Sequence, residues 1–149
     1  MINIKHITMQ KKTIPAVLLL TLVLVLSSCQ KADEQTVLRE RLKALVSDIE
    51  SHRYRAMNQY LAKDFSVGTQ YNSAQFLLYA QYKLKQYKNI VIRLSDIQIS
   101  LKDNVADVTF YAWSIGAKNW LPDSGRKYFV ESRWVKENNE WVILRLRWE

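Results

Sequence analysis

The chain has 149 residues, three glycines, two prolines and a formal net charge of +8 at pH 7, a composition that excludes linker and low-complexity proteins. Its single cysteine excludes an intramolecular disulfide, a zinc cluster and a cysteine-ligated iron–sulfur site. The two histidines, His6 and His52, lie in different segments, so we expect neither a metal site nor a bound cofactor.

The N-terminal segment joins a basic start to a short apolar run. Residues 1 to 13 contain three lysines and no acidic residue, and residues 14 to 26 are predominantly apolar. As a helix, such a run spans about 20 Å, which is shorter than the roughly 30 Å of bilayer hydrocarbon. This pattern predicts a secretory signal peptide over residues 1 to 28.

The apolar run ends in Leu26-Ser27-Ser28-Cys29. This tetrapeptide resembles the bacterial lipobox, in which the cysteine thiol receives diacylglycerol, the signal is cut before the cysteine, and the new amino terminus is acylated. The resemblance implies that Cys29 is the lipidation site and that its lipid chains anchor the protein in the membrane. The alternative is an uncleaved anchor helix that contains a cysteine by chance.

The residue after Cys29 is Gln30 and not Asp. By resemblance to Gram-negative lipoproteins, this implies a lipid-anchored protein of the bacterial cell envelope, in the outer membrane and facing the periplasm. Residues 29 to 36, comprising the acylated cysteine and a polar stretch, predict a short tether to the domain. An exported protein has little access to nucleic acid, so we expect no nucleic-acid partner.

Three helices are predicted at the start of the folded part. In residues 37 to 51 the apolar side chains recur at helical spacing. A short second helix is predicted over residues 53 to 65, and Ser73 is a plausible N-cap of a third helix that extends to Tyr87.

From residue 89 the apolar period changes from helical to alternating. The apolar phase shifts by one residue at Ser95-Asp96, which predicts a β-bulge. The fold class is therefore α+β, with three N-terminal helices packed on a curved four-stranded antiparallel sheet. The predicted strands are residues 89–102, 105–115, 127–136 and 141–148.

Two stretches, MNQYLAKDFS and the last hairpin YFVESRWVKENNEWVILRLRW, resemble parts of the NTF2-like superfamily. Together with the three predicted helices and the long bent strand, these stretches extend the resemblance over residues 37 to 149. Combined with the lipobox, the chain resembles the NTF2-like lipoproteins of proteobacteria. It implies a cone in which the bent sheet wraps the helices and leaves a pocket. Some members are isomerases, dehydratases or hydrolases and others only bind or dimerise, so the fold does not decide the function.

Alternation along the strands assigns one set of side chains to the inside of this cone. The pocket candidates are Phe110, Tyr128, Ser132, Trp134 and Trp148. The set contains no acid and no histidine, so we name no catalytic residue. The alternative function, an enzyme acting on a small hydrophobic molecule, would need His52 or Asp96 together with a tyrosine such as Tyr54. We expect Asp64 and Asp107 to be structural or solvated.

The opposite face of the sheet carries aromatic and arginine side chains, a composition typical of surfaces that recognise anions or proteins. The interface candidates on this face are Tyr111, Trp113, Arg133, Arg145 and Arg147, and Trp141 and Ile143 share their outward phase. We therefore expect a binding or assembly module whose partner is a second copy, an envelope protein, or a small hydrophobic or anionic ligand. We expect Trp120, in the loop of residues 116 to 127, to form a lid on the domain.

Overall fold

The structure is a computed structural model that describes the backbone of residues 16–117 and 124–149 and the side chains of residues 33–116 and 125–149. The predicted start of the signal peptide and the loop residue Trp120 lie outside these ranges. The chain divides into two compact units, Met1–Asp33 and Glu34–Glu149. No helix within the described ranges is both long enough and apolar enough to cross a membrane.

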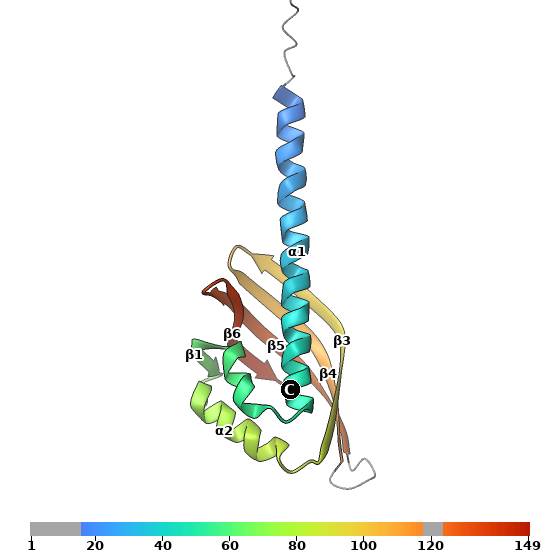
Figure 1. Ribbon diagram of the computed structural model, residues 1–149, viewed down its shortest axis with the longest axis vertical. Helices are drawn as coiled ribbons and strands as arrows, with labels where there is room; N and C mark the ends of the chain where they lie inside the picture. Colours follow the sequence, from blue (N-terminus) through green and yellow to red (C-terminus); the bar gives the residue numbers. More distant parts are fainter. Residues whose placement is uncertain (1–15, 118–123) are drawn as a thin grey trace, which may run out of the picture. The chain divides into compact units, whose positions relative to one another are not determined.

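The elements of the chain follow one another in the order seen in Figure 1. They are α1 (Ala16–Glu50), the 3-10 helix η1 (Tyr54–Tyr60), β1 (Leu61–Val67), β2 (Tyr71–Asn72), α2 (Ser73–Leu84), β3 (Asn89–Lys102), β4 (Val105–Ala117), β5 (Ser124–Glu137) and β6 (Glu140–Trp148). The three predicted helical segments are present, and α1 covers both the predicted tether and the first predicted helix. The second unit begins at Glu34, slightly before the predicted domain start at residue 37.

The sheet has six strands in the order β2-β1-β6-β5-β4-β3, so the prediction of four antiparallel strands is wrong. Strands β3 to β6 do form the predicted antiparallel meander, but β1 pairs parallel to β6 and β2 pairs antiparallel to β1. The error arose in β1, which was expected to be the end of the second helix. The helix prediction was based on the spacing of Tyr54, Met57 and Leu61, and Leu61 is the first residue of β1. The buried residues Ala62 and Phe65 of β1 are three positions apart, in a strand whose register with β6 is irregular.

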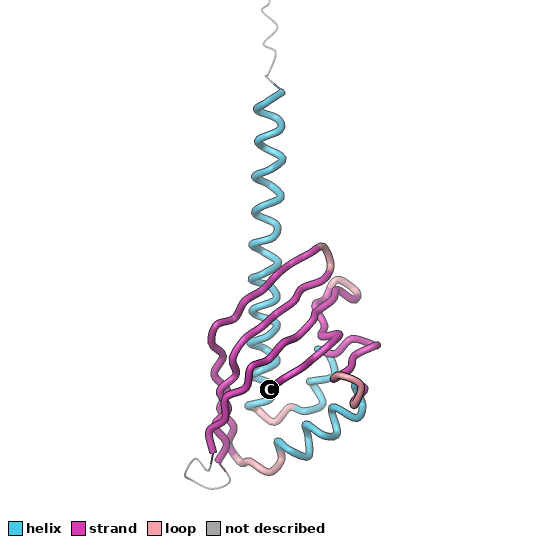
Figure 2. Tube along the Cα trace, turned by 180° about the vertical axis from the view of Figure 1, so that it is seen from behind, coloured by secondary structure: helices cyan, strands magenta, loops and turns pink. Residues whose placement is uncertain are grey.

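A β-bulge in β3 confirms the phase shift predicted at Ser95-Asp96. The register between β3 and β4 shifts at this point, and Asp96 has a φ of 54°. Bulges increase the local twist and bend the strand. This bend curves the sheet around the helices, as Figure 2 shows.

A second bulge, which was not predicted, lies in β6. Trp134 pairs with Ile143 and Arg133 with Arg145, so Leu144 is an extra residue. The extra residue reverses the faces of the preceding part of the strand. Trp141 and Ile143, which were expected to point outward, are therefore buried, with exposed fractions of 2% and 3%.

Helix α1 crosses the concave face of the sheet from Glu34 to Glu50. The Glu34 carboxylate accepts hydrogen bonds from Lys136 Nζ at 2.6 Å and Trp141 Nε1 at 2.8 Å, and these bonds hold its pKa below the ordinary value. At the other end of the helix, the backbone N–H of Ile92 donates to Glu50 at 2.7 Å. Leu38 and its neighbours on the same face fill the core between these two ends.

A buried carboxylate joins the end of α1 to η1. Asp48 accepts hydrogen bonds from Arg53 Nε and Tyr60 Oη, both at 2.7 Å, and from Gln59 Nε2 at 3.3 Å. Burial acts to raise the pKa of Asp48, but the hydrogen bonds from Tyr60 and Arg53 and the charge of Arg53 outweigh it, so the pKa lies below its ordinary value of 3.8.

Candidate functional site

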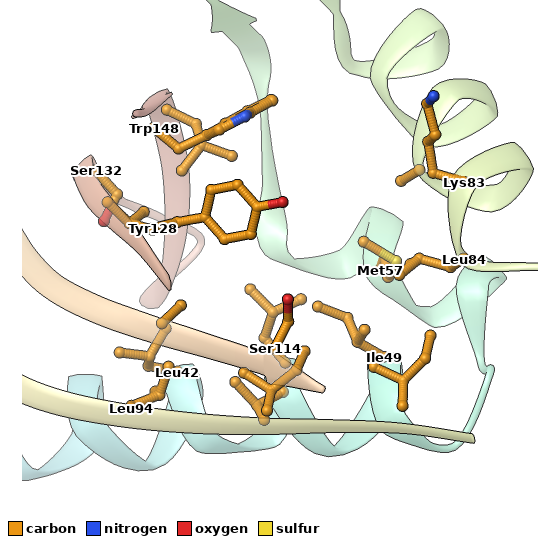
Figure 3. Close-up of a pocket in the computed structure, with 18 of the residues that line it drawn as sticks. Leu42, Ile49, Met57, Lys83, Leu84, Leu94, Ser114, Tyr128, Ser132 and Trp148 are labelled. Atoms are coloured by element: carbon orange, nitrogen blue, oxygen red, sulfur yellow. The ribbon is translucent and has the colours of Figure 1, made fainter. Parts of the chain in front are cut away.

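A cavity of about 600 Å³ opens between the concave face of the sheet, the second half of α1 and helix α2. Figure 3 shows side chains from these elements pointing into it. Its volume lies within the range of roughly 300 to 1,000 Å³ that is typical of small-molecule sites. Most of its lining is aliphatic or aromatic, with Leu42, Leu45, Val46 and Ile49 contributed by α1.

Helix α2 forms one wall of the cavity, and its start is fixed by a capping box. The Asn72 side chain accepts from the Gln75 N–H, and the Gln75 side chain accepts from the Asn72 N–H, both at 3.0 Å. The Phe76 ring packs between Phe65 and Trp148. Its centroid lies 5.2 Å from that of the Phe65 ring and 6.3 Å from that of the Trp148 ring. This aromatic cluster joins α2 to β1 and β6 beside the cavity.

All five predicted pocket residues line the cavity: Phe110, Tyr128, Ser132, Trp134 and Trp148. Ser132 is not available to a ligand, because its hydroxyl donates to the Val108 carbonyl at 3.1 Å and accepts from Trp134 Nε1 at 2.9 Å. Tyr128 and Trp148 reach toward the interior in Figure 3. They are the members of the predicted set that are placed to contact an occupant.

Few polar groups face the interior. The hydroxyls of Ser114 and Tyr128 point into the cavity (Figure 3) and have no hydrogen bond to another described residue. Lys83 and Arg126 are the cationic side chains among the described lining residues, which include no Asp, Glu or His. The described lining therefore suits an apolar molecule with a few polar atoms better than proton transfer by a carboxylate or an imidazole.

The residues of the enzyme alternative lie elsewhere. His52 and Tyr54 make an edge-to-face ring contact at 5.6 Å, but neither lines the cavity. His52 Nε2 hydrogen-bonds the Tyr87 carbonyl oxygen at 3.0 Å. The Tyr54 hydroxyl is buried without a hydrogen-bond partner in the described part of the chain, and burial raises its pKa. Asp96 is exposed at its bulge, so the structure does not bring these groups together at the cavity.

The arginines of the outer sheet face are engaged with groups of the chain itself. Arg133 makes two hydrogen bonds to Asp107 at 2.7 Å and 3.1 Å, and Arg147 Nε donates to Glu131 at 2.6 Å. Arg145 donates to the backbone carbonyl of Asp64 at 2.8 Å. This pairing reduces the capacity of the face to recognise a free anion.

The aromatic part of the same face is more accessible. Trp113 is 47% exposed, and the paired residues Val91 and Ile115 are 37% and 42% exposed. The Lys127 ammonium lies 3.9 Å from the Tyr111 ring centroid. An exposed apolar patch of this kind suits contact with a protein, and the expected role of this face as an interface stays a prediction.

The cavity residues that sequence reasoning did not name include Lys83, Ser114 and Arg126. Ser114 continues the inward alternation from Phe110 and was detectable from spacing alone. Lys83 is seven residues after Phe76 and therefore on the same face of α2. Nothing in the local sequence marks Arg126.

Gly116 allows Tyr87 to close one side of the cavity. A Cβ atom on Gly116 would lie 2.5 Å from Tyr87 Cδ1. We expect Gly116→Ala to lower the free energy of unfolding by about 1 to 2 kcal/mol, because the ring must move out of its packed position. Urea unfolding measures this loss. In a Tyr87→Ser background the same change should cost much less, and an equal cost in both backgrounds would show that the ring is not the cause.

Sequence comparisons give no relative, since neither a protein-family model nor a curated protein matches the chain. Solved structures do match. A protein of the NTF2-like family from Streptomyces avermitilis, assigned provisionally as a dehydratase, is 10% identical with a TM-score of 0.69, over 78% of this chain and 95% of its own. The domain has the NTF2-like fold.

Two further structures support this assignment. An NTF2-like protein of unknown function from Pseudomonas putida is 6% identical with a TM-score of 0.67, over 79% of this chain and 87% of its own. A provisionally assigned scytalone dehydratase from Novosphingobium aromaticivorans is 12% identical with a TM-score of 0.74, over 82% of this chain and 87% of its own. At such identities the likeness of this NTF2-like domain to them concerns the fold alone.

Proposed function

We propose that this NTF2-like domain binds a small, predominantly apolar molecule in its cavity and that lipid chains on Cys29 hold it in the bacterial envelope. The observation that carries the proposal is the open cavity of about 600 Å³ with its largely apolar lining. The hydroxyls of Ser114 and Tyr128, which have no hydrogen bond to another described residue, offer orientation to an occupant without supplying charge.

Binding is favoured over catalysis by the chemistry of the lining. Two of the similar structures carry provisional assignments as dehydratases, and removal of water from a substrate requires groups that take and give protons. Carboxylates and imidazoles are the usual groups for this, and neither occurs among the described residues around the cavity. The enzyme remains the second candidate, and it is supported by the fold of those two proteins.

The anchor is supported by the sequence Leu26-Ser27-Ser28-Cys29 at the end of an apolar run. The folded unit begins at Glu34, so residues 29 to 33 would separate the lipid from the domain. Five residues span at most about 18 Å when extended and about 8 Å as a helix. The domain would therefore work close to the membrane surface, on the periplasmic side of the outer membrane.

Filling the cavity tests the proposed binding. The probe is N-phenyl-1-naphthylamine, a neutral apolar fluorophore that becomes bright when it leaves water. We expect saturable binding to the protein and at least tenfold weaker binding to Ser114→Phe, because the new ring occupies the space that Ser114 faces.

The matched control is Ser100→Phe, which places the same ring at an exposed position of β3. This variant should bind the probe like the unmodified protein. Circular dichroism and thermal unfolding check that both variants are folded. Absence of saturable binding to the unmodified protein, or equal binding by the two variants, would contradict the proposal.

A further inference from the structure

We infer that the occupant of the cavity is an amphipathic anion, a single apolar chain with a negatively charged headgroup held by Lys83 and Arg126. The inference rests on the proposed function, because it assigns a chemical class to the ligand of the same cavity. It is carried by the position of these two cations, by their lack of acidic partners among the described residues, and by the neutral interior behind them.

Lys83 and Arg126 stand at the rim of the cavity. Both belong to its lining and both are exposed to solvent. They come from different walls, because Lys83 is on α2 and Arg126 is near the start of β5. Figure 3 shows Lys83 on the α2 side of the cavity, across from Tyr128 and Trp148.

Neither rim cation has an acidic partner in the described part of the chain. Lys83 Nζ lies 5.7 Å and 5.9 Å from the ring centroids of Tyr79 and Tyr82, and no described carboxylate forms an ion pair with it or with Arg126. By contrast, Arg133 and Arg147 on the outer face are each paired with a carboxylate. No described carboxylate therefore competes for these two charges with an anion that enters with a ligand.

The sequence around α2 adds to this positive field. Residues 65 to 95 contain no Asp or Glu, but they contain three lysines and one arginine. A region lined by one sign of charge attracts ligands of the opposite sign and repels cations. The wall of the cavity that α2 supplies thus selects against positively charged amphiphiles.

The interior explains why the headgroup would stay at the rim. Ser114 and Tyr128 are neutral, and the described residues behind the rim offer no charge to balance a buried anion. Moving an unpaired anion into such surroundings is strongly unfavourable. The apolar chain would lie inside against groups such as Trp148 and Leu42, while the headgroup would remain in contact with water and with both cations.

Displacement of N-phenyl-1-naphthylamine tests the inference with three probes of equal chain length, namely decanoate, 1-decanol and decyltrimethylammonium. An apolar cavity without charge selection would favour decanol over decanoate, because the carboxylate is better hydrated. We expect the protein to bind decanoate most tightly and decyltrimethylammonium most weakly. Neutralising the rim by Lys83→Gln with Arg126→Gln should weaken decanoate binding about fivefold and leave decanol binding unchanged.

The matched control is Lys85→Gln with Lys127→Gln, which removes the same charge from neighbouring residues outside the cavity lining. This control should leave the affinities for decanoate and decanol unchanged. If the neutral fluorophore binds but decanoate shows no preference, or if both double variants weaken decanoate equally, the inference is wrong and the proposed function stands. If neither the fluorophore nor any of the amphiphiles binds, both are wrong.

Discussion

Replacing Asp48 with alanine should lower the free energy of unfolding by about 2 to 4 kcal/mol at pH 7. The buried Tyr60 hydroxyl would lose its partner at 2.7 Å, and burial of a polar group without a hydrogen bond is costly. The Arg53 side chain is 59% exposed and can return to water, so its own contribution to the loss is small. Urea unfolding followed by tryptophan fluorescence measures the difference.

The stabilities of the unmodified protein and of the Asp48→Ala variant can also be compared as a function of pH. The pKa of Asp48 is lowered by folding, so its charge stabilises the folded state fully above its ordinary value of 3.8. This contribution falls as the pH drops below that value and is lost once the pH passes below the folded-state pKa. The difference in stability between the protein and Asp48→Ala should therefore shrink toward pH 3.

Asp96→Asn is the control for the Asp48→Ala variant. Asp96 is exposed and has a positive φ that asparagine tolerates well. Its substitution should change the stability by less than about 0.5 kcal/mol. An Asp48→Ala variant as stable as this control would show that the buried network contributes little.

Replacing Cys29 with serine should abolish lipidation completely. The lipobox reaction requires a thiol, so the variant should accumulate as a precursor and take up no fatty acid. Metabolic labelling with an alkynyl fatty acid in a Gram-negative host, together with gel mobility, measures both effects. Ser28→Ala keeps a small residue before the cysteine and should be labelled and cut normally. Labelling of Cys29→Ser would remove the lipobox interpretation.

The sequence predicted the parts of the fold that local patterns encode. Helical spacing located the part of α1 that packs on the sheet, and the phase shift at Asp96 located the bulge that curves it. Strand β1 was missed because Tyr54, Met57 and Leu61 are spaced as in a helix that extends into it, and its pairing with β6 is distant in sequence. The bulge at Leu144 was missed because residues 141 to 144 are all apolar and mark no change of phase, so only the pairing with β5 reveals the extra residue.

The cavity was predictable to a similar extent. Strand alternation placed Tyr128 and Trp148 on the concave face, where the structure has them. Whether that face is filled or open depends on how α2 packs on the strands, through contacts such as those of Phe76 with Phe65 and Trp148, which no local pattern encodes. Arg126 became a candidate only when the fold brought the start of β5 to the same rim as α2.

The course of α1 has a consequence for the route by which the proposed ligand would arrive and depart. Glu34 is held beside Lys136, near the turn that joins β5 to β6, whereas the cavity begins at Leu42 and its rim includes Arg126 at the other end of β5. The helix covers about 24 Å between Glu34 and Glu50. The start of the folded unit at Glu34 and the rim residue Arg126 thus lie near opposite ends of β5. A ligand bound as proposed would therefore enter and leave at the end of β5 that is distant from the start of the folded unit.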